Sequence, residues 1–201
     1  MRIANSANED PIERPLRACM LAYTFYENDG RVMRYAEALA QDGADVDAIV
    51  LRRPGQEPVS QINGVTVCRI QSREKNERGK LTYLWRLVAF FVRSMVEVTR
   101  RHRRRPYDLI HVHSVPDWEV FATLVPKLTG ARIILDIHDI VPEFYASKFG
   151  SNENDLLFKS LVAVERASIR YSDHVIISND IWRKKLLARS VKPDKCSVFL
   201  N

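Results

Sequence analysis

Ionisable side chains follow an apolar run near the middle of the sequence. Residues 132–143 read Arg-Ile-Ile-Leu-Asp-Ile-His-Asp-Ile-Val-Pro-Glu, so His138, Asp139 and Glu143 come directly after a strand-like segment. In open parallel α/β sheets, ligands bind outside the carboxyl ends of the strands. A histidine beside a carboxylate can orient a substrate hydroxyl or move a proton near pH 7. The pattern predicts His138 as a catalytic candidate; the alternative is that His138 packs and Asp139 caps a loop.

A second pair of imidazoles lies at the end of the preceding apolar run. His111 and His113 are two residues apart, which places both on one face of a strand, with His113 nearer its carboxyl end. We expect His111 to be a hydrogen-bonded core residue, whereas His113 either forms a wall of the site or contacts the ligand. Asp136 falls inside the next strand, where a buried carboxylate needs a partner.

These side chains can also be interpreted as metal ligands. His-x-His followed by Asp-x-His-Asp supplies suitable donor atoms. A catalytic zinc, however, needs three protein ligands around one point, and the remaining His102 and His174 fall in a basic run and at a strand start. We therefore predict no metal site.

A third strand end carries a glycine at the start of a helix. The first apolar run leads through residues 24–28 into Asp29-Gly30, and a helical pattern follows at once. Backbone N–H groups at such a helix start can approach a phosphate. The sequence contains neither G-x-G-x-x-G nor G-x-x-x-x-G-K-[ST], which excludes the usual dinucleotide site and the P-loop. The alternative is that Gly30 is a plain helix cap.

Short runs rich in Val and Ile alternate with helical patterns along the chain. The runs predict buried strands at 17–23, 45–51, 65–70, 107–113, 131–137, 173–178 and 196–200. The helical patterns lie at 31–42, 80–102, 117–129, 153–171 and 180–189, with Gly43 and Gly130 after two helix ends. Residues 52–61 should form a loop, and Asn63-Gly64 a turn. The order predicts a single Rossmann-like α/β domain with a doubly wound parallel sheet.

Composition and length restrict the class of protein. The chain has 201 residues and 46% hydrophobic content, enough for one domain, which we place at 17–201 after a flexible tail at 1–16. Residues 1–17 do not resemble a signal peptide, and no apolar run approaches the roughly 18 residues of a membrane span. Three cysteines without C-x-x-C spacing indicate neither a disulfide framework nor zinc. We expect a cytoplasmic protein.

One segment makes the protein basic. Residues 71–105 hold eleven Lys or Arg against three Glu, within a chain of net charge +6. The segment predicts an amphipathic helix whose apolar surface is broader than one core contact requires. One interpretation is a surface that docks on anionic lipid. Its candidate residues are Trp85, Phe90, Arg100, Arg101, Arg103, Arg104 and Arg105. The alternatives are a solvated helix end and a nucleic-acid patch, the latter without a supporting motif.

A series of motifs in this order resembles the N-terminal half of the GT-B glycosyltransferases of family 4, retaining nucleotide-sugar enzymes of polysaccharide and glycolipid assembly. The first strand and its loop up to Asp29-Gly30 resemble the family's opening. Residues 107–113 are similar to its D-h-h-H-x-H strand, where h is apolar. Residues 135–143 resemble its D-x-H-D-x-x-P-E form, and residues 165–178 its E-R…A-D-x-h-h-x-x-S segment. The resemblance covers about residues 17–201.

This resemblance implies sugar transfer from a nucleotide sugar, as substrate, to a lipid-linked or other saccharide acceptor, with no cofactor and no required metal. It implies that His138 contacts the donor sugar near the reacting centre and that Asp29-Gly30 lies near the donor phosphate. His113, Asp139 and Glu143 would belong to the acceptor side. The basic helix would hold the enzyme on the inner face of the plasma membrane.

The sequence departs from the family pattern in two places. Asp29 stands where the family has the first Gly of a Gly-Gly loop, and the sequence ends at Asn201, before the second domain that would bind the donor. We therefore expect an acceptor-side domain with little or no transferase activity by itself. The competing hypothesis is a non-catalytic, partner-binding subunit of a split glycosyltransferase.

Overall fold

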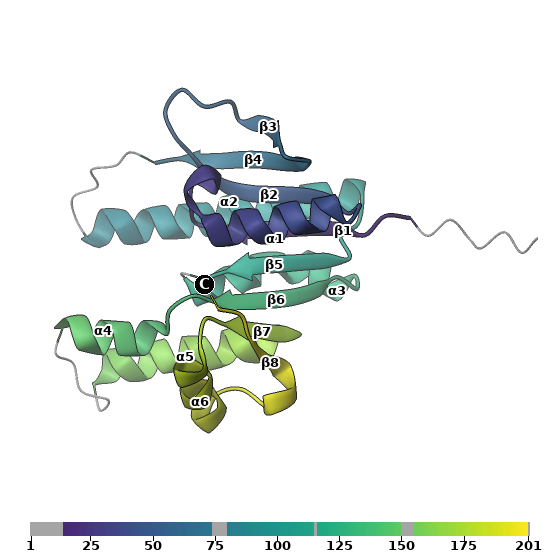
Figure 1. The fold of residues 1–201 in the computed structure, drawn as a ribbon. Helices are drawn as coiled ribbons and strands as arrows, with labels where there is room; N and C mark the ends of the chain where they lie inside the picture. The colour runs from purple at the N-terminus through teal and green to yellow at the C-terminus, as the bar shows by residue number, and fades with distance from the viewer. Residues whose placement is uncertain (1–13, 74–79, 115, 150–154, 201) are drawn as a thin grey trace, which may run out of the picture.

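The computed structural model describes residues 14–73, 80–114, 116–149 and 155–200, which build one eight-stranded sheet with helices on both faces (Figure 1). The strand order is β3-β4-β2-β1-β5-β6-β7-β8, and every neighbouring pair is parallel except β3 and β4. The predicted doubly wound α/β fold is confirmed. The predicted flexible tail at 1–16 falls mostly outside the described residues.

The strands and helices follow each other as the apolar pattern predicts. The strands are β1 Arg17–Ala22, β2 Asp45–Arg52, β3 Val59–Ile62, β4 Val65–Ser72, β5 Leu109–His113, β6 Arg132–Ile137, β7 His174–Ile177 and β8 Cys196–Val198. The α-helices are α1 Gly30–Gln41, α2 Lys80–Arg104, α3 Leu124–Leu128, α4 Val141–Phe149, α5 Leu156–Tyr171 and α6 Asp180–Arg189. Short 3₁₀ helices are η1 Tyr26–Asn28, η2 Asp117–Thr123 and η3 Pro193–Lys195.

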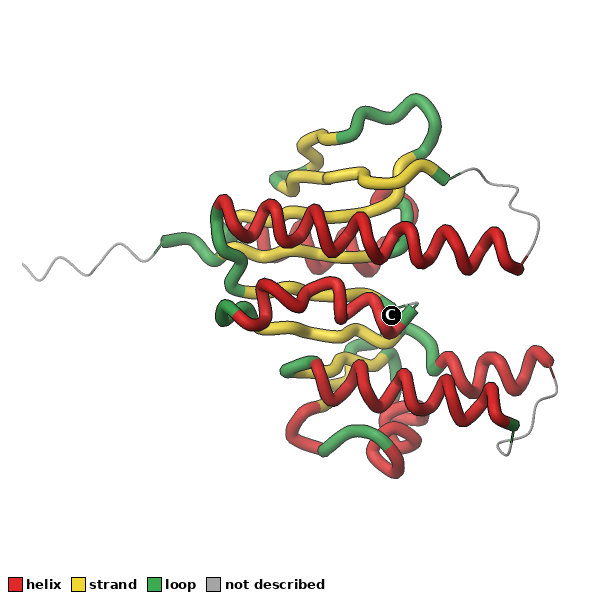
Figure 2. The backbone as a smooth tube through the Cα atoms, turned by 180° about the vertical axis from the view of Figure 1, so that it is seen from behind, coloured by secondary structure: helices red, strands yellow, loops and turns green. Residues whose placement is uncertain are grey.

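The two sides of the sheet carry separate apolar cores. Along β1, Cys19 and Leu21 point to the side of α2, α3 and α5, whereas Met20 and Ala22 point to α1. Figure 2 shows α2, α3 and α5 across the rear of the sheet, and Figure 1 shows α1 in front. Because successive side chains of a strand alternate between faces, central strands that are buried on both sides read as continuous apolar runs.

Three local expectations need correction. Residues 59–62, expected in a loop, form β3, which pairs antiparallel with β4 through the predicted Asn63-Gly64 turn. Both turn residues have positive φ, 47° and 83°, as a two-residue hairpin turn requires. Residues 141–149 form the unpredicted helix α4, with Pro142 in its first turn, where its missing N–H is harmless. The single helix expected at 117–129 is divided into η2 and α3.

Two residues predicted to lie on the basic surface of α2 make structural contacts within the fold instead. Phe90 is fully buried and its ring lies 5.0 Å from that of Tyr23, so its assignment to the surface is wrong. The Arg101 guanidinium lies 3.3 Å from the Asp47 carboxylate and 2.7 Å from that of Glu97, so Arg101 ties α2 to β2 and is not a surface charge. The broad apolar surface of α2 arises because its inner side is buried between the sheet and η2.

The described part of the chain contains no helix that is both long and apolar enough to cross a bilayer.

Two carboxylic acids are buried where η2 packs against α2 and α5. Asp117 is 5% exposed and Glu119 is 1% exposed. Burial raises the pKa of Glu119 to about 8, although the Ser94 hydroxyl beside it favours the charged form. Glu119 therefore carries a proton in the folded state at neutral pH, when an unfolded glutamate would have lost it.

The protonated state of Glu119 predicts a pH-dependent stability. Between the unfolded pKa near 4.5 and the folded pKa of about 8, only the folded chain keeps this proton, so the free energy of unfolding falls as pH rises. The contribution is about 1.4 kcal/mol per pH unit. In urea unfolding between pH 5 and pH 8, the free energy of unfolding of Glu119→Gln should therefore fall less steeply with pH than that of the parent chain. The exposed control Glu57→Gln should follow the parent chain; equal slopes for all three would contradict the assignment.

Candidate active site

The sheet register brings three strand ends to one level. Ala22 on β1 pairs with His113 on β5, and His113 pairs with Asp136 on β6. Their side chains and that of His111 lie on the sheet face that α1 covers, as Ala22 belongs to the α1-side core. The ends of the strands predicted at 17–23, 107–113 and 131–137, which are β1, β5 and β6, therefore meet at one edge.

A buried ion pair connects α1 to β6. The Arg31 guanidinium donates through Nε to Asp136 Oδ2 at 2.9 Å and through Nη2 to Oδ1 at 2.5 Å. Their side chains are 5% and 0% exposed, so the partner that the sequence demands for Asp136 is Arg31. Burial by itself would raise the pKa of Asp136, but contacts with His111 and His113 outweigh it and hold that pKa below its ordinary value. The bidentate geometry also favours the ionised carboxylate.

Two stacked histidines line the other side of this carboxylate. The rings of His111 and His113 are 4.3 Å apart and nearly parallel, and His111 Nε2 and His113 Nδ1 lie 3.5 and 3.4 Å from Asp136 Oδ2. The Tyr35 ring covers the stack, with its centroid 4.9 Å from that of His111. Burial, followed by the neighbouring His111, lowers the pKa of His113 to about 3, so His113 is neutral at physiological pH.

His138 is the member of this group that reaches solvent. Its side chain is 22% exposed, and its Nε2 lies 3.3 Å from His113 Nδ1. Both atoms also face the Asp136 carboxylate, since His113 Nδ1 lies 3.4 Å and His138 Nε2 3.8 Å from Asp136 Oδ2. Burial lowers the pKa of His138, and the Ser178 hydroxyl fixes the backbone by donating to the His138 carbonyl at 3.0 Å. His138 is thus a positioned, neutral imidazole.

We call Arg31, His111, His113, Asp136 and His138 the Asp136 cluster. Among the described residues, His111, His113 and Asp136 form the one group whose donor atoms could hold a metal, all within 4.8 Å of one another. The parallel rings do not converge on one point, and Arg31 contacts both oxygens of the carboxylate. The geometry fits a hydrogen-bonded ion pair better than a tetrahedral metal site.

A cavity of about 230 Å³ opens at the carboxyl ends of β1 and β5, and we call it the strand-end crevice. It is lined by Ala22, Tyr23, Thr24, Asp29, Arg73, Tyr83, His113 and Ser114. The Arg73 guanidinium lies over the rings of Tyr23 and Tyr83, at 5.2 and 5.8 Å from their centroids. The crevice therefore offers a cation, an imidazole and hydroxyl groups to a polar ligand.

Asp29, and not Gly30, caps α1. The Asp29 carboxylate accepts hydrogen bonds from the backbone N–H groups of Arg31 and Val32, both at 3.2 Å. These amides belong to the set that would otherwise bind a phosphate at the helix start. A Cβ atom on Gly30 would meet no atom within 4 Å, so the space above Gly30 is open.

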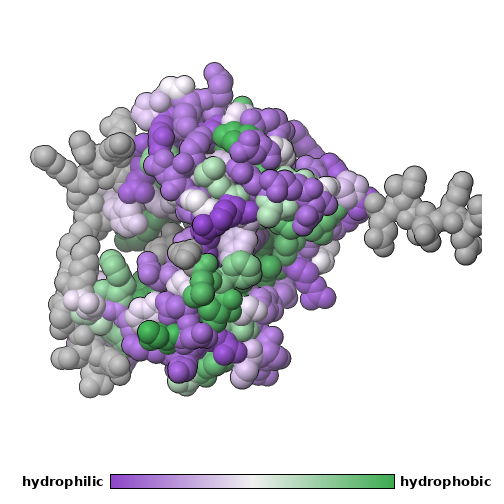
Figure 3. Space-filling model, in the orientation of Figure 1, coloured by the Kyte–Doolittle hydropathy of each residue, from purple (hydrophilic) through white to green (hydrophobic). Residues whose placement is uncertain are grey.

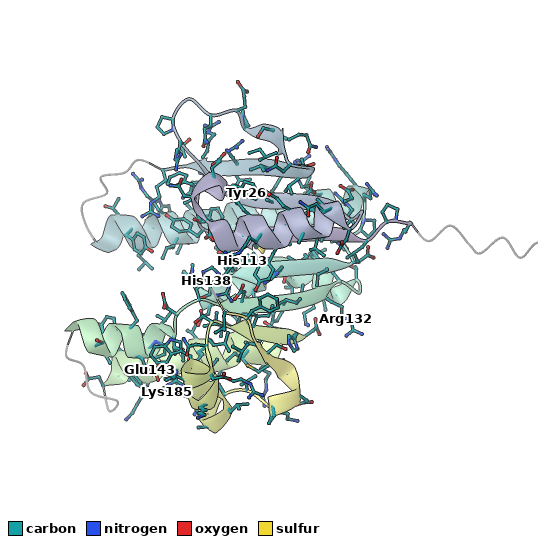
Figure 4. All side chains as sticks on the ribbon, viewed as in Figure 1. Tyr26, His113, Arg132, His138, Glu143 and Lys185 are labelled. Carbon is teal, nitrogen blue, oxygen red and sulfur yellow. The ribbon has the colours of Figure 1, made fainter. Side chains whose placement is uncertain are left out.

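The remaining predicted site residues do not join the crevice. Glu143 forms a bidentate ion pair with Arg189, at 2.5 and 2.9 Å, and Arg189 also binds Glu165. Figure 4 shows Glu143 beside Lys185, apart from His113 and His138. Glu143 lines a different cavity of about 460 Å³ between α4, α5 and α6. Asp139 is exposed in the loop after β6.

The sequence did not indicate two residues of the site, Arg31 and Arg73. Arg31 falls in the first turn of α1, where a charged side chain ordinarily lies in solvent, and the unpaired Asp136 was the signal that a cation was missing. Arg73 precedes a segment outside the described residues, and no pattern connects it to the crevice.

Comparison with known proteins agrees with this architecture. A family model described as "Glycosyl transferase 4-like domain" matches residues 30–201. None of the curated proteins matches the sequence significantly.

Solved structures show the same fold at low sequence identity. Sucrose-phosphate synthase from Thermosynechococcus elongatus aligns with a TM-score of 0.67 and 16% identity, over 92% of this chain and 48% of that protein. A UGT transferase from Siraitia grosvenorii in complex with UDP aligns with a TM-score of 0.57 and 9% identity, over 92% and 50% of the two chains. A putative UDP-N-acetylglucosamine 2-epimerase from Listeria monocytogenes gives 0.55 and 12%, over 91% and 44%. This chain thus spans about half the length of these structures.

The buried ion pair predicts a large and asymmetric effect of substitution. Arg31→Met leaves the Asp136 carboxylate buried without its cation, which should lower the free energy of unfolding by about 3–5 kcal/mol. Arg34→Met, on the exposed side of the same helix, should change it by less than about 0.5 kcal/mol. In urea titrations, Arg31→Met combined with Asp136→Leu should recover most of the loss. If Arg31→Met lowered the free energy of unfolding no more than Arg34→Met does, the role of the ion pair would be refuted.

Proposed function

We propose that this chain is the acceptor-side domain of a retaining glycosyltransferase. The proposal starts from the family and the fold: the chain belongs to the glycosyl transferase 4-like domain family and has the fold of the N-terminal half of a GT-B glycosyltransferase. The enzyme transfers a sugar from a nucleotide sugar to a lipid-linked acceptor in surface polysaccharide synthesis. The observation that carries the proposal is the strand-end crevice with a fixed, neutral and partly exposed His138 beside it.

His138 would contact the donor sugar. The neutral tautomer of His138 with its proton on Nδ1 would present that N–H as a donor, and an N–H donor can bind a sugar hydroxyl. The Asp136 cluster fixes the ring without giving it a charge, so the contact needs little reorganisation when charge develops during transfer. Asp29-Gly30 would face the donor phosphate, where the open space above Gly30 favours approach and the Asp29 carboxylate opposes it.

The acceptor would occupy the crevice. Arg73 suits the phosphate of a lipid-linked acceptor, and His113 and Ser114 suit its hydroxyl groups. Asp139, exposed in the loop after β6, and Glu143, held by Arg189, would shape the outer acceptor side.

Transfer would require a second, donor-binding half, because both substrates must be positioned against each other. Figure 3 shows hydrophobic surface around the C-terminus in the middle of the α1 face, where Phe199 and Leu200 are exposed. This surface would contact the donor half. Whether that half is a further domain or a separate chain distinguishes a GT-B enzyme from the partner-binding subunit of a split glycosyltransferase.

The outer side of α2 would lie on the anionic inner face of the plasma membrane. Trp85, Val92 and Val96 share this side and are exposed, and Arg103 and Arg104 follow them without an ion pair among the described residues. Arg100 and Arg105 are partly exposed but pair with Glu97 and Asp45. An apolar stripe followed by free guanidinium groups suits a lipid surface better than water.

Sugar transfer tests the main proposal. Radiolabelled UDP-, GDP- and dTDP-sugars should give little labelled lipid with this chain alone, and sustained transfer once the donor-binding half is added. His138→Ala should then lower the transfer rate about 100-fold or more, because a donor to the reacting centre is lost. His174→Ala, whose imidazole contacts Ser197 at the far end of β7, is the matched control. Sustained transfer by the chain alone, or an unaffected His138→Ala enzyme, would refute the proposal.

Vesicle sedimentation tests the membrane contact. Each basic residue near an anionic surface contributes about 1 kcal/mol, so Arg103→Ser with Arg104→Ser should weaken binding to phosphatidylserine vesicles roughly 30-fold. Lys184→Ser with Lys192→Ser, which removes two exposed charges elsewhere, should have little effect. Equal losses in the two double variants would show only a dependence on net charge and would contradict a specific α2 surface.

A further inference from the structure

An apolar pocket of about 310 Å³ lies between α2, η2, α4 and α5, apart from the Asp136 cluster. Leu87, Trp118, Val141, Leu161 and Val164 form most of its wall. Its size is at the lower end of the range for ligand sites, so it would hold a part of a ligand and not the whole.

The pocket adjoins the strand-end crevice. Tyr83 lines both cavities. In the segment after β5, Ser114 lines the crevice and Asp117, three residues later, lines the pocket. A ligand with a polar group in the crevice can therefore extend an apolar group into the pocket past Tyr83.

Asp117 is an unsatisfied polar group in this apolar wall. The residue is 5% exposed, and its Oδ1 has no hydrogen-bond partner among the described residues. Burial raises its pKa to about 7, so a neutral acid that can donate a proton to an oxygen atom is accessible near neutral pH. A buried polar atom without a partner is costly, and a ligand that supplies the partner recovers that cost.

The helices that form the pocket also carry exposed apolar side chains. Figure 2 shows α2 on one side of η2 and α3, and the α4–α5 pair on the other, both projecting beyond the carboxyl ends of the strands. The exposed apolar residues on these helices include Leu84, Phe144, Leu157 and Val164. Exposed apolar side chains on the helices that form an apolar pocket suit a ligand that arrives from an apolar environment.

We propose that the pocket binds the hydrophobic chain of a lipid phosphate acceptor, whose phosphate lies in the crevice near Arg73 and meets Asp117 at the junction of the two cavities. The inference rests on the proposed function and specifies its acceptor. The inference is supported by the apolar wall, by the guanidinium of Arg73 in the crevice, and by Asp117 Oδ1 in the pocket wall, which has no hydrogen-bond partner among the described residues.

Binding of n-decyl phosphate to the full chain tests the inference. With ¹³C-labelled Leu and Val methyl groups, saturable NMR shifts should appear at Leu87, Val141, Leu161 and Val164. Inorganic phosphate and decyltrimethylammonium, which each lack one half of the ligand, should not reproduce them. Shifts confined to Val92 and Val96 on the outer side of α2 would mean surface association only, and would overturn the pocket.

Two substitutions separate the pocket from the rest of the surface. Val164→Trp, at the partly exposed edge of the pocket, should fill it and weaken decyl phosphate binding at least tenfold, whereas Leu128→Trp, at an exposed position on α3, should not. Asp117→Leu should weaken decyl phosphate about tenfold relative to decanol, since one hydrogen bond to a charged group is lost. Thermal unfolding midpoints check that each variant folds. Unchanged binding in Val164→Trp would refute the site, and equal effects on both ligands would refute the role of Asp117.

The two proposals fail differently. Pocket binding without sugar transfer in the complete enzyme would leave the lipid site and remove the glycosyltransferase assignment. Transfer that is unaffected by Val164→Trp would keep the enzyme and remove the pocket.

Discussion

The arrangement of the candidate site depends on the ion pair between Arg31 and Asp136. A buried carboxylate near the end of a central strand is stable only if a cation reaches it, and α1 supplies that cation from its first turn. The same contact sets where α1 begins relative to β6, and it holds the stacked His111 and His113 against the carboxylate. His138 takes its position from this stack. A polar cluster thus lies beside the apolar core that α1 forms with the sheet.

The sequence predicts the sheet well because its central strands are buried on both faces. Continuous apolar runs leave little ambiguity about β1, β2, β5 and β6, and the period of two already places His111 and His113 on one face. The edge is harder to predict. Strand β3 has four residues with alternating exposure, and it exists because the positive φ values of Asn63 and Gly64 return the chain onto β4.

The errors at the site have a common physical cause. A sequence shows which residues are ionisable, but not which of them pair with each other. Glu143 comes soon after β6 in the sequence, as His138 and Asp139 do. Helix α4 nevertheless carries it to Arg189. Phe90 and Arg101 belong to a helix whose inner side is buried deeply enough to include residues that look suited to a surface. Long-range pairing and burial depth decide these cases, and neither has a local signal.

If this chain takes part in sugar transfer as proposed, the Asp29 cap would affect the release of the product. If the leaving diphosphate forms at the start of α1, it gains negative charge when its bond to the sugar breaks. A carboxylate already bound to the amides of Arg31 and Val32 repels that extra charge more than it repels the intact donor. A helix start that binds phosphate weakly would then release the nucleotide diphosphate product quickly. The product would therefore inhibit turnover less.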